Sequence, residues 1–384
     1  MKKSDYDTKY LKTLDGIRAL AILIIVCYHI WQQSWWAPSI GPISLTILLR
    51  YGFLIVDMMI LISSFCLFIP YARSMVYKED IPSVKEFYLK RITRIFPSYY
   101  LALFFFFFMG LFTKGITFNS FFFKDTIMHI FFVHNWSVDT LLYTNYSAVL
   151  WTIAIEVQFY LIFPFIARAF VKKPKMTYSI MMIIGLLCTY LIAINVDEGN
   201  LSYYVNHFLL FIPVFANGML ASWFYIKYTK NKKRKVVSDI LFTIVSILSI
   251  VWYIELCKRV VDNVQLWQID NRLLLSLVFM VIIISTLLAS KIYQKIFDNR
   301  LMKFIAVISL NLYIYHHFII VKLKEARIPY YSGDILPNIS GNKTWQWQYT
   351  LIALLASIIV ASIITYLYEK PVAKYIKKKC KIKG

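Results

Sequence analysis

Two ionisable side chains, Arg18 and His29, occur in the otherwise apolar stretch LDGIRALAILIIVCYHI. On an α-helix the step between them is about three turns with ~20° left over, so both would face one side. They would lie ~16 Å apart along the helix axis. Ionisable groups at membrane depth are costly and usually face a cavity or a partner, so we interpret this face as functional.

A second pattern, KRITRIFPSYY, places Arg91 and Arg94 three residues apart. On a helix the two guanidiniums would point the same way and form a fork for phosphate oxygens. Ordinary cationic anchoring at the cytoplasmic surface explains the same residues. The spacing alone does not separate these two interpretations.

Other ionisable residues inside apolar segments are Asp57, Glu156 and His316. The two carboxylates fit either a functional site or a structural hydrogen bond between helices. His316 adjoins His317 near the end of its segment, so we expect one of this pair to be merely interfacial. Arg18 can pair with Asp15 at i, i+3 and still have a functional role.

The composition indicates which elements position these residues. The chain has 384 residues, of which 59% are hydrophobic and 18% aromatic, which is too apolar for a soluble domain. We expect an all-α integral membrane protein, one transmembrane domain over residues 1–384 with no appended soluble domain. About ten segments are long enough to span a bilayer, near residues 14–33, 45–69, 93–113, 149–170, 177–194, 204–226, 238–256, 272–290, 303–322 and 348–368. The charged segment 119–136 is predicted to be interfacial or re-entrant.

The net charge of +22 follows the membrane topology rather than a nucleic-acid site. Basic loops 70–92, 171–176, 227–237 and 291–302 alternate with loops that are poor in Lys and Arg, 34–44 and 195–203. The positive-inside rule then places both termini in the cytoplasm. The five cysteines are scattered and form no C-x-x-C pair, so we expect neither a disulfide framework nor a zinc site.

The polar residues lie in motifs that resemble those of acyltransferase family 3, integral membrane O-acyltransferases that modify cell-surface glycans. Arg18 and His29 are similar to the family's Arg/Lys-x10-His element, and the Arg91 segment to its Arg-x-x-Arg element. Further resemblances involve Asp57 and Ser63, Trp151, Glu156 and Tyr160, Phe215 and Gly218, Ser309, Tyr313 and His316, and Tyr368, Glu369 and Pro371. The sequence has Ile55 and Ser64 where the family usually has glycine, and Leu310 where it usually has tyrosine.

The resemblance implies a cytoplasmic acyl-CoA donor and a hydroxyl acceptor on a cell-surface or exported glycan. Acetyl-CoA is the default donor, succinyl the next acyl group, and no metal is expected. Arg18, Arg91 and Arg94 would receive the donor's phosphates, since arginine suits clustered anions. The thin pantetheine arm would then bring the thioester to His29.

His29 has two candidate roles, which the sequence does not separate. As general base it would take the proton of the acceptor hydroxyl. As nucleophile it would carry the acyl group itself. Glu156 or Asp57 would hold the imidazole, with a slight preference for Glu156. His316, Tyr313 and Trp151 are further candidates for the site.

A different class of protein, a transporter or flippase of glycan precursors, would also bury charged groups. Such a protein more often has inverted repeats and paired broken helices, which this sequence lacks; a sensor role explains the arginine and histidine motifs least.

Some relatives carry a fused extracytoplasmic hydrolase-like domain. Without one, the membrane unit would act directly or pass the group to a separate extracytoplasmic transferase or polysaccharide synthesis machinery. A bacterial cytoplasmic membrane is expected, and capsule, peptidoglycan, teichoic acid and glycolipid acceptors remain open.

Overall fold

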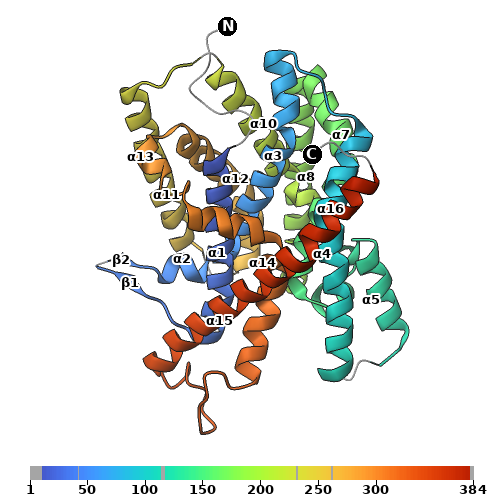
Figure 1. The fold of residues 1–384 in the computed structure, drawn as a ribbon, viewed down its shortest axis with the longest axis vertical. Coiled ribbons are helices and arrows are strands. Elements are labelled where there is room, and N and C mark those ends of the chain that lie inside the picture. The colour runs from blue at the N-terminus through green and yellow to red at the C-terminus, as the bar shows by residue number, and fades with distance from the viewer. Residues whose placement is uncertain (1–10, 42, 114–116, 231, 261–262, 381–384) are drawn as a thin grey trace. The chain divides into compact units, whose positions relative to one another are not determined.

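The computed structural model describes residues 11–41, 43–113, 117–230, 232–260 and 263–380. In these residues the chain is helical (Figure 1), apart from one antiparallel ribbon of two-residue strands, β1 (Ser39–Ile40) and β2 (Ile43–Ser44). Ten helices of the described chain are long and apolar enough to cross a membrane, which confirms the expected number. They are Lys12–Ser34, Gly52–Tyr77, Val84–Phe112, Ala148–Lys172, Pro174–Asn195, Phe208–Thr229, Val236–Lys258, Val264–Leu288, Arg300–Glu325 and Lys343–Lys379.

Two compact units divide the chain, and each is described by itself. Unit 1 comprises residues 1–20, 56–87 and 152–303. In it α10 packs on α8 and α12, and α11 lies along α12. Its elements are the start of α1 (Lys12–Ser34), α3 (Ile55–Tyr77), α7 (Trp151–Lys172), α8 (Pro174–Asn195), η4 (Glu198–Asn200), α9 (Leu201–Tyr204), η5 (Phe208–Phe211), α10 (Ile212–Thr229), α11 (Val236–Lys258), α12 (Val264–Leu288) and α13 (Lys291–Gln294).

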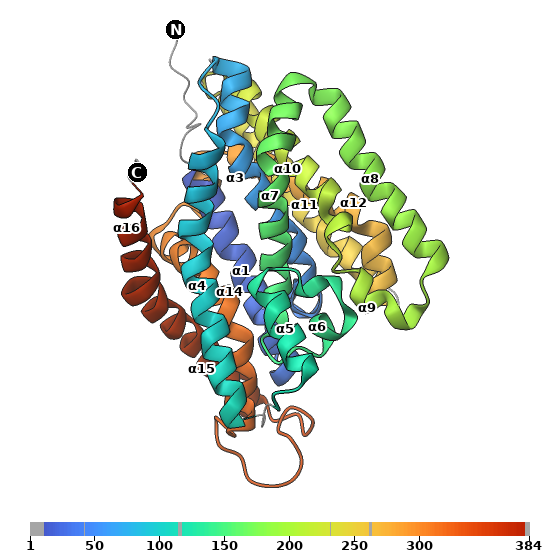
Figure 2. The ribbon, with the colours of Figure 1, turned by 90° about the vertical axis from the view of Figure 1, so that its right-hand side faces the viewer.

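Unit 2 comprises residues 21–55, 88–151 and 304–384. In it α4 and α14 run side by side (Figure 2), with the rings of Phe105 and Phe106 against Phe318. Its elements are the rest of α1, the ribbon, α2 (Thr46–Arg50), η1 (Gly52–Leu54), α4 (Val84–Thr113), α5 (Ser120–Ile130), η2 (His134–Trp136), α6 (Val138–Leu142), η3 (Ala148–Leu150), α14 (Arg300–Glu325), α15 (Lys343–Ile364), the π-helical η6 (Thr365–Glu369) and α16 (Lys370–Lys379).

Local sequence explains where several helices begin. Asn119 caps α5 by accepting a 2.9 Å hydrogen bond from the Phe122 N–H, and Asn263 caps α12 at 3.0 Å from the Leu266 N–H. Asn342 does the same for α15, where the Trp345 N–H donates at 3.0 Å. Such side chains satisfy N–H groups that have no partner inside the first helical turn. These starts therefore follow from short polar residues placed just before apolar runs.

Four helices differ from the predicted spans by about two to three turns. Helix α4 begins at Val84 rather than at residue 93, and the last spanning helix ends at Lys379 rather than at residue 368. The second span was predicted from residue 45, but α2 and η1 precede it and α3 begins at Ile55. The chain turns at Gly52, where an added Cβ would lie 2.8 Å from the Tyr28 Cβ, so this approach to α1 requires glycine. The eighth span was predicted from residue 272, but α12 begins at Val264. Arg272 therefore lies about two turns inside α12 rather than at its start.

The segment 119–136, predicted to be interfacial or re-entrant, forms α5 and η2, and α6 follows it. Helix α5 has 11 residues and is therefore ~16 Å long, about half of what a bilayer core requires. Lys124 of α5 pairs with Asp139 of α6 at 3.2 Å. We call residues 117–148 the cap segment.

The Phe-x-x-Gly motif of α10 holds α3 in unit 1. An added Cβ on Gly218 would lie 2.6 Å from the Leu61 carbonyl oxygen and 2.7 Å from the Ser64 Cβ. The Ser64 hydroxyl in turn donates a 2.6 Å hydrogen bond to the Phe215 carbonyl. Serine replaces the family's usual glycine here without an unsatisfied hydroxyl, so the two helices remain closely packed.

Candidate active site

Three histidines meet within unit 2, where α1 and α14 lie together. The ring centroid of His29 lies 5.0 Å from that of His316 and 4.9 Å from that of His317. His316 is fully buried and His29 is half-buried. Both members of the adjacent pair therefore contact His29. Of the two, only His316 was named as a candidate from the sequence.

The side chain of Gln32 determines how the His29 ring is held. Gln32 donates through Nε2 to the Tyr28 hydroxyl at 2.8 Å, so its Oε1 accepts the 2.9 Å hydrogen bond at His29 Nδ1. An amide oxygen only accepts, which places the proton of neutral His29 on Nδ1 and the lone pair on Nε2. Sequence analysis expected Glu156 or Asp57 in this position, and it missed Gln32. An i, i+3 glutamine on the same helix is a weak signal.

His316 has the same arrangement of its ring nitrogens. Its Nδ1 donates to the backbone carbonyls of Tyr313 at 2.7 Å and Leu312 at 3.1 Å. Its buried Nε2 has no hydrogen-bond partner within the described residues. The candidate Tyr313 thus holds His316 through its carbonyl, while its ring lies 5.7 Å from the imidazole. Two neighbouring imidazoles therefore have a lone pair on Nε2, which suits them to accept a proton.

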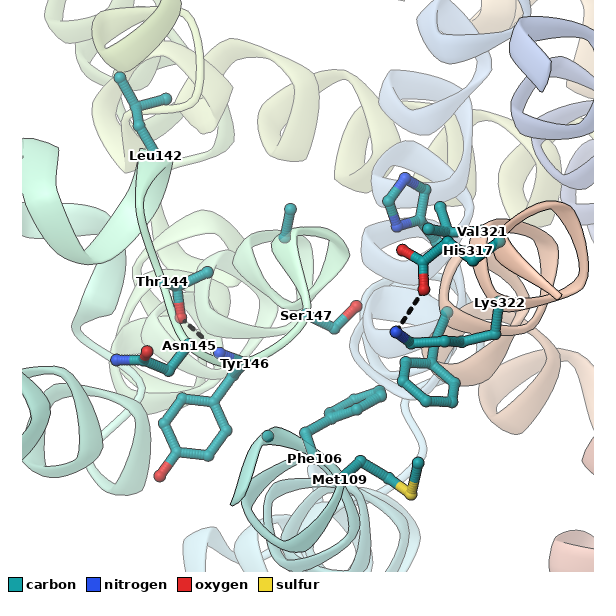
Figure 3. Close-up of a pocket in the computed structure, with 14 residues that line it drawn as sticks. Phe106, Met109, Leu142, Thr144, Asn145, Tyr146, Ser147, His317, Val321 and Lys322 are labelled. Atoms are coloured by element: carbon teal, nitrogen blue, oxygen red, sulfur yellow. Dashed lines mark hydrogen bonds and ion pairs between the residues drawn. The ribbon is translucent and has the colours of Figure 1, made fainter. Parts of the chain in front are cut away.

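A cavity of about 210 Å³ adjoins the histidine cluster within unit 2 (Figure 3). One wall comes from α4 and α14 and includes Phe106, His317 and Lys322. The opposite wall is the end of the cap segment and includes Asn145 and Ser147. Figure 3 shows the Ser147 hydroxyl directed toward the side that carries Lys322. Sequence analysis did not anticipate this cavity, because a loop far from α14 in sequence closes it.

The cap segment is held by a buried carboxylate and imidazole. Asp125 and His129 are both fully buried, with an Oδ1 to Nδ1 distance of 3.0 Å. Asp125 Oδ2 accepts a 2.8 Å hydrogen bond from the Asn145 N–H and a 3.2 Å one from the Thr144 hydroxyl. These contacts fix the loop that lines the cavity. Their i, i+4 spacing on α5 is typical of such a pair.

A second imidazole, His134, stacks on His129 with centroids 3.8 Å apart and planes 5° from parallel. Burial, and then the neighbouring His129, keep the pKa of His134 well below its ordinary value. His134 is therefore neutral at pH 7.

In unit 1 the guanidinium of Arg18 is surrounded by partners. Its Nη1 lies 3.1 Å from Asp15 Oδ1, the pairing expected from the i, i+3 spacing. Its Nη2 donates to the Cys66 sulfur at 3.2 Å, and Glu156 adds a further negative charge nearby. Helix α1 is continuous from Lys12 to Ser34, so the helical spacing assumed for Arg18 and His29 is confirmed.

Glu156 occupies the same unit on α7. Its Oε2 accepts a 3.0 Å hydrogen bond from the Tyr160 hydroxyl, which lies 3.3 Å from the Ser63 hydroxyl. Two motifs that are about a hundred residues apart in sequence, one on α3 and one on α7, thus meet here. Trp151, also from the α7 motif, is the first residue of that helix and directly follows η3.

Asp57 forms a buried ion pair with an arginine that sequence analysis missed. Arg272 Nε donates to Asp57 Oδ2 at 2.9 Å, and both side chains are 4% exposed or less. Arg272 Nη1 also donates to the Val205 carbonyl at 2.8 Å, and its guanidinium lies 4.0 Å from the Phe211 ring centroid. The eighth span was predicted to begin at residue 272, which placed Arg272 at its edge. A buried charge is costly, and the pairing with Asp57 offsets part of that cost.

Arg91 and Arg94 both lie within α4, where Pro97 follows inside the helix. Arg94 is exposed and interacts electrostatically with Glu369 of η6 in unit 2. Glu369 Oε2 also accepts a 2.6 Å hydrogen bond from Asn311. The Arg-x-x-Arg motif and the motif around Glu369 are therefore brought together within one unit.

These features define a multi-pass membrane protein with buried imidazoles beside a cavity and with arginines near carboxylates. Within the described residues, no group of three or more His, Cys, Asp and Glu side chains is arranged to hold a metal ion. The model of a family described as an acyltransferase domain matches residues 11–367. The chain belongs to acyltransferase family 3, the family that its motifs resemble.

Several curated proteins are similar to the chain. A Staphylococcus aureus (strain COL) protein with the provisional name of an O-acetyltransferase is 29% identical over 336 residues, 81% of this chain and 51% of that protein. The peptidoglycan O-acetyltransferase OatA of Listeria monocytogenes is 26% identical over 392 residues, 96% of this chain and 57% of that protein. A provisionally named acetyltransferase of Acidianus two-tailed virus is 24% identical over 321 residues. The chain spans about half the length of the bacterial relatives, and no solved structure matches it.

Proposed function

We propose that the protein is a membrane O-acyltransferase that moves an acetyl group from cytoplasmic acetyl-CoA to a hydroxyl of a cell-surface or exported glycan. Family membership and the O-acetyltransferase names of its relatives support the class of reaction. The observation that carries the proposal is the imidazole of His29, whose Nδ1 is held by Gln32 and whose Nε2 bears a lone pair. The cytoplasmic membrane of a bacterium is its proposed location.

His29 has two routes to the product. In the first, Nε2 takes the proton of the acceptor hydroxyl while that oxygen attacks the thioester carbonyl; the carbon–sulfur bond breaks and the proton passes to the CoA thiolate. In the second, Nε2 attacks the thioester and CoA leaves as the thiolate. The hydroxyl then attacks the acyl-imidazolium, the carbon–nitrogen bond breaks to restore the imidazole, and the hydroxyl proton passes to the thiolate. Both routes require Nε2 to be unprotonated, which the contact with Gln32 favours.

Arginines would receive the phosphates of the donor. Arg91 and Arg94 share one face of α4, and Arg94 is exposed. A guanidinium can bind phosphate oxygens through two parallel hydrogen bonds, unlike lysine. The carboxylates beside Arg18 and Arg94 would hold these side chains in place before the donor arrives. Arg18 is the arginine of the helix that carries His29.

The decisive experiment uses the full chain in lipid nanodiscs with radiolabelled acetyl-CoA and chitotetraose, a soluble N-acetylglucosamine oligomer. We expect transfer of label to the sugar with release of CoA, and loss of both in His29→Ala and Arg18→Ala. His207→Ala, which alters a histidine outside the cluster, is the matched control. A transporter would leave the thioester intact, and full turnover by His29→Ala would end the proposal.

A further inference from the structure

We propose that the cavity beside His317 is the acceptor site and that it binds one uncharged sugar ring of the glycan. This inference rests on the proposed acyl transfer and specifies its second substrate. The cavity is lined by residues of unit 2 alone. His317, whose ring is 4.9 Å from that of His29, forms part of its wall (Figure 3). A ring bound there would present its hydroxyls to the imidazole cluster.

A buried hydroxyl at the cavity wall indicates that a polar ligand is required. Ser147 is 7% exposed, and its Oγ has no hydrogen-bond partner within the described residues. Buried polar groups in native proteins are almost always paired, so an unpaired one at a cavity marks a position for a bound group. The adjacent Asn145 adds an amide to the same wall. Hydroxyl and amide groups both donate and accept, which suits a ligand that carries several hydroxyls.

The charges at the cavity favour a neutral ligand. Lys322 is the lysine of the lining, and its ammonium lies 2.5 Å from the carboxylate of Glu325, which also lines the cavity. The two charges therefore cancel. A phosphodiester would have to compete with Glu325 for this single lysine, whereas a sugar needs no cation. The charge balance thus separates a sugar acceptor from a polyol-phosphate polymer.

The volume of the cavity suits a single sugar ring. Its volume of about 210 Å³ is below the roughly 300–1,000 Å³ typical of sites for drug-sized ligands. Phe106 and Phe318 supply an apolar surface opposite the polar wall, as small-molecule sites usually do. Asp125 holds the Asn145 backbone, so the polar wall is fixed before the ligand arrives. The site therefore binds one sugar ring in a defined orientation.

Two variants and a matched control test the acceptor site in nanodiscs, with chitotetraose as the neutral probe. Ser147→Ala removes one hydrogen bond, so the KM for chitotetraose is expected to rise about 3- to 10-fold while the KM for acetyl-CoA stays within about twofold. Ala148→Trp fills the cavity from an exposed lining position and is expected to abolish transfer and direct chitotetraose binding. Ser120 is an exposed serine of the cap segment that does not line the cavity, so Ser120→Ala should change neither acetyl transfer nor chitotetraose binding.

Three results would overturn the inference. One is unchanged chitotetraose binding in both Ser147→Ala and Ala148→Trp. Another is preferential acetylation of a glycerol-phosphate trimer by the unaltered chain, because the compensated charges argue against an anionic acceptor. The third is a KM for acetyl-CoA that rises with that for chitotetraose, which would place the cavity on the donor path. Failure of acyl transfer itself is recognised separately, because CoA would then not be released even where direct binding of chitotetraose is intact.

Discussion

Unit 1 and unit 2 bury polar side chains in different ways. In unit 1 two arginines pair with carboxylates, Arg272 with the fully buried Asp57 and the half-buried Arg18 with Asp15. In unit 2 the polar centre is a set of imidazoles, and His316 keeps a buried Nε2 without a hydrogen-bond partner within the described residues. A paired charge has already made its interactions, whereas a neutral nitrogen with a lone pair remains available to a substrate. We therefore assign proton transfer to unit 2 and an electrostatic role to the pairs of unit 1.

The largest effect on activity is expected from replacing His29, which tests the proposed proton transfer in unit 2. Replacing it with alanine removes the proposed base or nucleophile, so kcat should fall by about 10²- to 10⁴-fold, the range typical of a general base. The thermal midpoint in detergent should stay close to that of the parent chain because no charge is left unpaired. His207→Ala should keep full activity. A large loss of stability in His29→Ala would instead make the cluster a packing feature.

Breaking the buried ion pair of unit 1 should instead lower the stability of the protein. Asp57→Ala leaves Arg272 buried and unpaired, which is expected to cost about 3–5 kcal/mol of stability. Thermal unfolding would measure the loss, and adding Arg272→Met should recover most of it. A stable Asp57→Ala variant that has lost acetyl transfer would return Asp57 to the chemistry and break the contrast.

Donor binding gives a smaller effect. Arg94→Ala removes a charged hydrogen bond to phosphate, so the KM for acetyl-CoA should rise about tenfold or more while kcat changes little. Arg94→Lys keeps the charge but not the paired geometry. Its KM for acetyl-CoA should lie between those of the parent chain and Arg94→Ala. Lys85→Ala, on the same helix, is the control. An unchanged KM in Arg94→Ala would mean that Arg94 only anchors the helix.

Gln32 tests how far the histidine cluster depends on orientation. Gln32→Ala removes the hydrogen bond at His29 Nδ1, so kcat should fall about 3- to 10-fold with little change in either KM. Gln32→Glu places a negative charge beside the ring and should move the acid limb of the pH–rate profile to higher pH, since it favours the imidazolium. An unshifted profile would contradict the assignment of Gln32 as the residue that positions His29.

The smallest effect concerns the cap segment. Because the folded-state pKa of His134 is lowered by burial and by His129, the unfolded state binds its proton more readily. The contribution of His134 to stability is therefore present above about pH 6.5 and is lost as the pH falls below it. Hydrogen-exchange protection factors of residues 117–148, which correct for the intrinsic pH dependence of amide exchange, should fall between pH 7 and pH 5, and His134→Phe should remove that fall. His129, which stacks on His134 and pairs with Asp125, is present in both chains.

Much of the fold follows from local sequence. Ten apolar runs predicted ten spanning helices, and the spacing of Asp15 and Arg18 predicted their pairing. Both depend on residues close together in the chain, so periodicity and length are sufficient. Family motifs then supplied the acyltransferase assignment that the match over residues 11–367 confirms.

The missed features depend on contacts between distant residues. The charge of Arg272 inside α12 is compensated by Asp57, which lies 215 positions earlier in the sequence. Ser147 reaches a cavity only because Asp125 fixes the loop before it. No pattern within one segment encodes these two relations, and a structure is needed to see them. Gln32 is different, because it lies only three residues from His29, but it lacks a charge and its spacing alone is a weak signal.

The final spanning helix, Lys343–Lys379, exceeds the bilayer core. Its 37 residues correspond to about 55 Å of helix, against roughly 30 Å of hydrocarbon. Much of the surplus is α16, whose last turn carries Lys377, Lys378 and Lys379. Such a basic end is drawn to anionic headgroups at about 1 kcal/mol per lysine. Lipid composition and ionic strength would therefore govern how firmly this end adheres to the membrane surface.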